Sequence, residues 1–183
     1  MGIILAFAPF LAFAVIDRLF GSVEGLLAGA LVSAVFLLRD WFAKNQTPKI
    51  LEIGTFILFA GLALYALLGN PQWSIFKVRL LVDGGLLLIV LATLVLRQPF
   101  TLQYAREGVP KEFWDRPEFL RTNDVITAVW ALAFAAMVFA DLILLYVPQW
   151  PPKVGILITI AALVAAVKFT KWYPARAASG SPG

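Results

Sequence analysis

Apolar runs of about 20 residues recur along this chain, and only short polar segments separate them. An α-helix needs a run of roughly that length to cross a hydrocarbon core ~30 Å thick. Hydrophobic residues make up 61% of the chain and charged residues only 14%. A soluble domain is typically about 25% charged. Because backbone polar groups in lipid must be satisfied within their own segment, these runs predict transmembrane helices.

The runs predict an all-α, polytopic membrane protein with six transmembrane helices arranged as three hairpins. Turns as short as Gly21-Ser22 leave room only for antiparallel neighbours. A single transmembrane domain is expected over residues 1–174, with a polar loop at 97–122 and a flexible tail at 175–183. The predicted spans cover residues 2–20, 23–42, 50–68, 80–96, 123–146 and 155–172.

Basic residues predict the orientation of the spans. Six spans put both termini on one side, and eleven of the 15 basic residues then fall on that side. Cytoplasmic segments of membrane proteins carry such an excess, so the N- and C-termini and the 97–122 loop are expected in the cytoplasm. The net charge of +4 then reflects orientation and contact with anionic membrane lipid. No nucleic-acid partner is expected.

The chain contains no cysteine and no histidine. This excludes zinc sites built from His and Cys, haem held by histidine, cysteine nucleophiles and histidine general bases. Carboxylates, Lys, Tyr and Ser or Thr remain for any chemistry. We therefore expect no cofactor and no metal site, and we assign no catalytic residue.

A first group of candidate residues lies at the predicted outer ends of the spans. Asp83 and Asp141 stand about one turn inside, where an ionised side chain is costly and usually faces the bundle interior or a partner. One interpretation is a polar vestibule that binds an ion, a proton or a small polar head group. The other is a ring of ion pairs that locks the hairpin ends. The outer-face cluster comprises Asp17, Arg18, Lys77, Arg79, Asp83 and Asp141, with Glu24 and Lys153 beside it.

A second group lies in the longest polar interruption, from Arg97 to Thr127. Pro110 and Pro117 each suit the first turn of a helix, so a short turn is expected after Pro110 and a helix that runs from Pro117 into the fifth span. Docking of a partner protein or an anionic lipid, an ordinary ordered loop, and catalysis by carboxylates are the alternatives. No nucleophile motif, phosphate loop or metal spacing supports catalysis. The candidate contact residues are Gln103, Tyr104, Arg106, Glu107, Trp114, Arg121, Asn123 and Asp124.

Several residues match a pattern that extends over most of the chain. They are Pro9, Phe13, Asp17-Arg18 and Leu19-Phe20-Gly21 in the first hairpin, the basic-x-basic core of Ser74 to Arg79, and then Val109-Pro110, Trp114, Asn123, Trp130, Phe134 and Asp141. In these residues the chain resembles the intracellular septation protein A family of bacterial inner-membrane proteins. It departs from the family at Val78, where the family has Trp, at Asp141, where it has Asn, and in about five extra residues between Trp114 and Asn123.

The resemblance implies a multi-pass inner-membrane protein linked to cell division and envelope synthesis, which acts through other membrane proteins and has no established catalytic activity. The expected partners are thus membrane lipids and other inner-membrane proteins, and self-association stays open. The alternative function is a small transporter or channel whose polar site includes Asp83 and Asp141. A membrane enzyme acting on lipid is a third interpretation.

Overall fold

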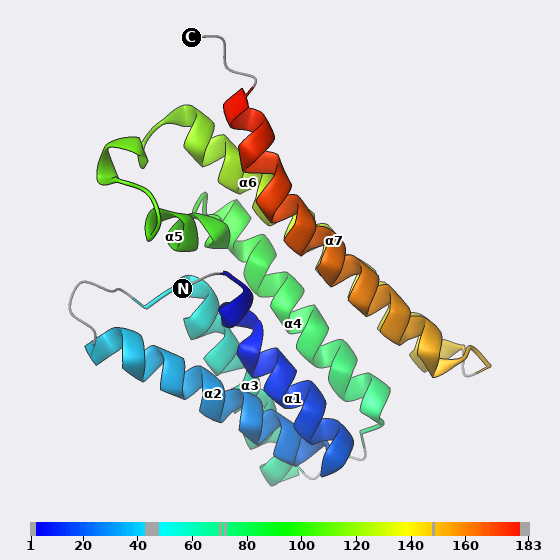
Figure 1. Cartoon of the computed structure of the whole chain (residues 1–183). Coiled ribbons are helices and arrows are strands. Elements are labelled where there is room, and N and C mark those ends of the chain that lie inside the picture. The colour runs from blue at the N-terminus through cyan, green and yellow to red at the C-terminus, as the bar shows by residue number, and fades with distance from the viewer. Residues whose placement is uncertain (1–2, 43–47, 70, 72, 148, 180–183) are drawn as a thin grey trace. The chain divides into compact units, whose positions relative to one another are not determined.

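The computed structural model describes residues 3–42, 48–69, 71, 73–147 and 149–179 (Figure 1). Every regular element in that part of the chain is a helix, which confirms the predicted all-α class. The elements are η1 (Ile3–Phe7), α1 (Ala8–Leu19), α2 (Ser22–Phe42), α3 (Ile50–Gly69), α4 (Ile75–Val95), α5 (Phe100–Arg106), η2 (Lys111–Phe113), α6 (Pro117–Tyr146) and α7 (Pro152–Ser179). Contacts divide the chain into an N-terminal unit, residues 2–89, and a C-terminal unit from residue 90 onward.

Five of the described helices, α2, α3, α4, α6 and α7, are long and apolar enough to cross a membrane. This confirms that the chain is a membrane protein with transmembrane helices. The segment expected as the first span consists of the 5-residue 3-10 helix η1 followed by the 12-residue α1.

Several helix bounds differ from the predicted spans. Helix α4 begins at Ile75 and not near residue 80, because Ser74 caps it: its Oγ accepts the backbone N–H of Lys77 at 3.2 Å. Helix α6 begins at Pro117, as predicted for a proline in the first turn. Helix α7 continues through Ser179, past the start of the expected tail at residue 175. Helix α5, inside the 97–122 loop, was not predicted.

The N-terminal unit is built on close helix approach. Gly21, with φ of +124°, makes the tight turn between α1 and α2. A β-carbon at Gly29 of α2 would lie 2.7 Å from the ring of Phe59, so α3 can pack here only against glycine. In the same way Gly85 of α4 lies against Leu58 of α3. The core of the unit comprises Phe13, Leu26, Phe59, Ala63, Ala66, Val78 and Val82.

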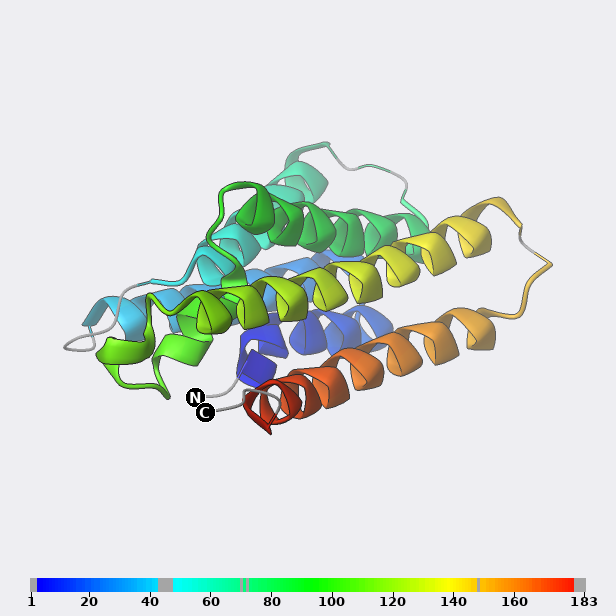
Figure 2. The same cartoon turned by 90° about the horizontal axis from the view of Figure 1, so that it is seen from above.

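The C-terminal unit is organised around α6. Helices α6 and α7 form a long antiparallel pair, and α5 packs against α6 (Figure 2). Phe100, Trp130 and Phe134 are almost completely buried. The Phe100 and Trp130 rings meet edge to face at 6.4 Å between centroids, and those of Trp130 and Phe134 lie 5.6 Å apart. This aromatic group fixes the start of the 97–122 loop to α6.

Candidate functional site

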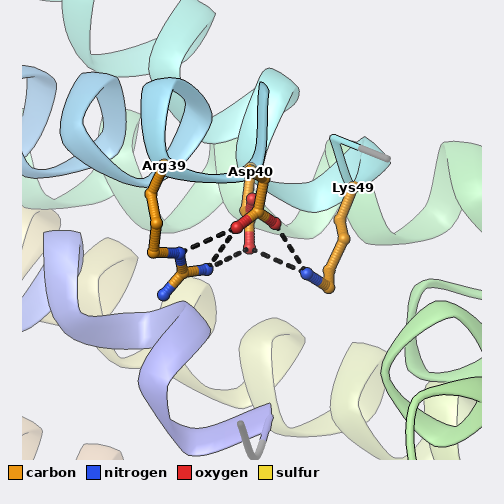
Figure 3. A network of polar contacts seen from close by, with 4 residues as sticks. Arg39, Asp40 and Lys49 are labelled. Atoms are coloured by element: carbon orange, nitrogen blue, oxygen red, sulfur yellow. Dashed lines mark hydrogen bonds and ion pairs between the residues drawn. The ribbon is translucent and has the colours of Figure 1, made fainter. Parts of the chain in front are cut away.

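Four charged side chains gather at one end of the α2–α3 pair, and we call this group the ionic centre: Arg39, Asp40, Lys49 and Glu52. Asp40 is 0% exposed, and Lys49 and Glu52 are each 5% exposed. Oδ1 of Asp40 accepts Nε–H of Arg39 at 2.8 Å, and Oδ2 accepts Nζ–H of Lys49 at 2.8 Å. Figure 3 shows the two cations on opposite sides of this carboxylate.

The antiparallel register of α2 and α3 brings these residues together. Asp40 lies in the last turn of α2, and Lys49 directly precedes α3, where its carbonyl accepts the N–H of Ile53 at 3.0 Å. Glu52 follows one turn later, with Oε1 3.6 Å from Nζ of Lys49 and 3.9 Å from Nη2 of Arg39. The Gly29–Phe59 contact further along the pair keeps the same register.

The ionic centre carries two acids and two bases, so its formal charges cancel. Removing an ion from water costs several kcal/mol, and a buried pair offsets that cost only with good geometry. Both oxygens of Asp40 are engaged by cations, and the guanidinium of Arg39 also lies 5.0 Å from the ring centroid of Phe36. This arrangement can hold the ends of α2 and α3 together electrostatically.

A second buried polar group, the neutral polar centre, joins α5 to α6 and α6 to α7. Oγ1 of Thr101 donates to the carbonyl of Asn123 at 3.0 Å and lies 2.8 Å from Oγ1 of Thr127. Nε1 of Trp130 donates to Oγ1 of Thr170 at 2.9 Å. These side chains carry no charge, so this centre is held together by hydrogen bonds between neutral groups. The neutral polar centre consists of Thr101, Asn123, Thr127, Trp130 and Thr170.

The 97–122 loop presents cations stacked on aromatic rings, and we call this the cation–aromatic surface: Arg106, Lys111, Phe113, Trp114 and Arg116. The cationic groups of Arg106 and Lys111 lie 5.2 and 5.8 Å from the ring centroid of Trp114. Arg116 lies 4.4 Å from that of Phe113. Trp114 is fixed by donating Nε1–H to the carbonyl of Val109 at 2.9 Å.

A shallow cleft of about 450 Å³ opens beside this surface. Its lining residues are Val109, Phe113, Arg116, Glu118 and Phe119. The lining therefore combines three apolar side chains with one cation and one anion.

The predicted contact residues do not all lie at the surface. Glu107, Arg121 and Asp124 are exposed, and Gln103, Tyr104, Arg106 and Trp114 are partly buried. Asn123 is buried instead, and its Nδ2 donates to the carbonyl of Phe119 at 2.9 Å. The side chain of Asn123 is therefore buried within the C-terminal unit and is not exposed for contact with a partner.

The members of the predicted outer-face cluster differ in their burial. Asp17 is buried and accepts Oγ–H of Ser22 at 2.6 Å, which closes the α1–α2 turn. Arg18 and Lys77 are exposed, and Arg79 is partly buried. Asp83 lies in α4 of the N-terminal unit at 8% exposure, and Asp141 lies in α6 of the C-terminal unit at 1%. Their action as one polar site stays a prediction.

The ionic centre was missed as a group by sequence reasoning. From the sequence, Arg39 and Asp40 were interpreted as residues at the membrane interface. Glu52 was interpreted as a residue at the start of the third span. One signal was present: acids and bases both occur on or beside the same short connection, between residues 42 and 50. In an antiparallel helix pair, residues near such a connection lie at the same end of the pair.

The chain matches no protein-family model, and neither a curated protein nor a solved structure is found to resemble it. The resemblance to the septation protein A family thus rests on the residues named above and stays a prediction.

Proposed function

We propose that this chain is a non-enzymatic protein of the bacterial inner membrane that supports cell division or envelope biogenesis by docking other membrane proteins. We propose six spans with cytoplasmic termini, as the distribution of basic residues favours. The length of the first segment supports this number. Five residues of 3-10 helix and 12 of α-helix rise ~28 Å together, close to the ~30 Å of a hydrocarbon core.

The observation that carries the docking function is the cation–aromatic surface. Its support is buried: Thr101 is hydrogen-bonded to α6, and Phe100 packs on Trp130. Trp and Arg are the residues most enriched among the energetically dominant positions of protein interfaces. A surface already ordered before binding loses little conformational entropy when a partner docks. The resemblance to septation protein A favours a membrane protein as that partner.

The test is co-purification of partner proteins from native membranes in mild detergent. The variant Trp114→Ala/Arg121→Ala/Asp124→Ala removes the partly buried Trp114 from the loop and two exposed charged side chains from the start of α6. We expect it to recover any specific partner at least about tenfold less than the unsubstituted chain, because truncating a dominant interface residue typically costs 2 kcal/mol or more.

The matched control is Arg18→Ala, which removes an exposed cation at the end of α1. It should leave partner recovery unchanged. Equal recovery with the triple variant and the unsubstituted chain would rule out docking through this loop.

Transport is the second candidate, favoured by the burial of Asp83 and Asp141 within apolar helices. Ionisable groups within spans are rare and often mark an ion or proton pathway. The variant Asp83→Asn/Asp141→Asn, reconstituted in vesicles, should abolish proton or sodium flux if the chain is a transporter. The docking function instead predicts unchanged partner recovery with this variant.

A further inference from the structure

The C-terminal helix differs from the rest of the chain in its charge. No Asp or Glu follows Asp141 in the sequence. Helix α7 nevertheless carries four bases: Lys153 near its start, and Lys168, Lys171 and Arg176 in its last turns. In the 97–122 loop, by contrast, acids stand between the bases. The end of α7 is therefore a purely basic segment.

The basic side chains lie on the side of α7 that faces away from α6. The α6 side is marked by Ala166, which is buried, and by Thr170, which accepts Nε1–H of Trp130. Lys168, Trp172 and Arg176 recur every four residues and so form one stripe on the helix. All three are exposed, and we call them the basic stripe.

Aromatic rings hold the basic stripe in place. The guanidinium of Arg176 lies 5.4 Å from the ring centroid of Trp172. Phe169 lies 5.8 Å from Trp172 and stacks on Tyr173 at 5.0 Å between centroids. Trp and Tyr are enriched at the boundary between hydrocarbon and head groups.

The length of α7 sets the depth of the stripe. A helix that enters the hydrocarbon near Pro152 leaves it ~30 Å later, near Trp172, at 1.5 Å per residue. Lys168 then lies one turn deeper, with an ammonium group that must reach toward the head groups, and Arg176 lies one turn further out. The two cations bracket the layer that contains lipid phosphates.

From this geometry we infer that the basic stripe, with Lys171 beside it, binds the head groups of anionic phospholipids. Charge complementarity selects the ligand, because three bases face the head-group layer and the segment has no acid to oppose them. A juxtamembrane base favours an anionic surface by about fivefold. A zwitterionic head group carries a positive charge as well as its phosphate, so its electrostatic attraction to these bases is weaker. This inference does not depend on the docking function of the loop.

The test is lipid retention by the full chain. The protein is reconstituted in vesicles of phosphatidylcholine with one quarter phosphatidylglycerol and extracted in mild detergent, and the retained lipids are quantified by mass spectrometry. The unsubstituted chain should retain phosphatidylglycerol above its bulk fraction. We measure enrichment as the ratio of retained phosphatidylglycerol to retained phosphatidylcholine, divided by the same ratio in the vesicles. In Lys168→Gln/Lys171→Gln/Arg176→Gln we expect this enrichment to fall at least about tenfold.

Two controls make the result specific. Arg106→Gln/Lys111→Gln/Arg116→Gln removes the same charge from the cation–aromatic surface and should keep the enrichment, as should the charge-preserving Lys168→Arg/Lys171→Arg. Inorganic phosphate at about 10 mM should not displace the lipid. Unchanged enrichment in the α7 variant, an equal loss in the loop variant, or displacement by phosphate would each overturn the inference.

Discussion

Two buried polar groups, one in each unit of the chain, are held together in opposite ways. The ionic centre of the N-terminal unit holds four formal charges in direct contact, and the neutral polar centre of the C-terminal unit contains hydroxyls, an amide and an indole. Each joins helices that also pack through apolar side chains. The two centres should differ in the stability lost when one partner is removed. A buried charge without its partner lowers the free energy of unfolding far more than a buried hydroxyl without its partner.

The two centres also differ in what they leave available to a ligand. Both carboxylate oxygens of Asp40 already accept hydrogen bonds from Arg39 and Lys49, so few hydrogen-bonding positions remain for a ligand. The neutral polar centre instead belongs to the same unit as the cation–aromatic surface, whose cations lie against aromatic rings. We therefore expect substitutions in the ionic centre to act mainly on stability, and substitutions in the cation–aromatic surface to act mainly on binding.

The largest expected effect is that of Asp40→Asn. The substitution keeps the shape of the side chain but leaves the buried ammonium of Lys49 without its closest anion. Breaking a buried pair in this way typically costs about 3–5 kcal/mol. Unfolding of the detergent-solubilised protein by SDS measures the loss. The control Asp124→Asn, at an exposed position of α6, should stay within ~0.5 kcal/mol of the unsubstituted chain.

A double variant tests whether the loss comes from the orphaned charge. Asp40→Leu/Lys49→Met removes both partners, so its cost should be smaller than the sum of the two single substitutions by about 1–3 kcal/mol. Additive costs would mean that the two side chains contribute independently, and the contrast between the two centres would fail.

A smaller effect is expected for Thr101→Val in the neutral polar centre. The substitution removes the hydroxyl that bonds the carbonyl of Asn123 and the hydroxyl of Thr127 but keeps the β-branched shape. Loss of a neutral hydrogen bond costs about 1–2 kcal/mol when a buried partner is left unsatisfied. The same SDS titration measures it, with Thr122→Val, at a half-exposed position, as control. A loss as large as that of Asp40→Asn would show that charge is not what distinguishes the centres.

The pattern of apolar residues predicted helix bounds well where turn-forming residues stand at both ends of an apolar run. Helices α2 and α3 agree with their predicted spans to within one residue. The positive φ of Gly21 marks the start of α2. The start of α4 was misplaced because the basic residues were read as a boundary, whereas Ser74 supplies a helix cap that admits them. Helix α5 follows Pro99 in a polar segment without periodicity, and nothing local predicted it.

The candidate sites were less predictable because they depend on register between helices. That Asp40 meets Lys49 follows from how α2 and α3 are aligned, which packing such as that of Gly29 on Phe59 determines. The burial of Asn123 depends likewise on α5 folding back on α6. Single residue types, by contrast, were informative: the local turn after Pro110 and the helix start at Pro117 both follow from proline.

The smallest predicted effect concerns the backbone conformation of Arg97, just after the end of α4. Arg97 has φ of +54°, in the left-handed region, and caps α4: its N–H bonds the carbonyl of Leu94, and the N–H of Gln98 bonds that of Thr93. Arg97→Gly should raise the free energy of unfolding by about 0.5–1 kcal/mol, because glycine adopts this conformation without a β-carbon clash. Arg97→Ala removes the same charge but keeps the clash, so it should change little. If both variants changed the free energy of unfolding equally in SDS titration, the effect would come from the lost charge. Backbone strain at Arg97 would then not contribute to the stability of the C-terminal unit.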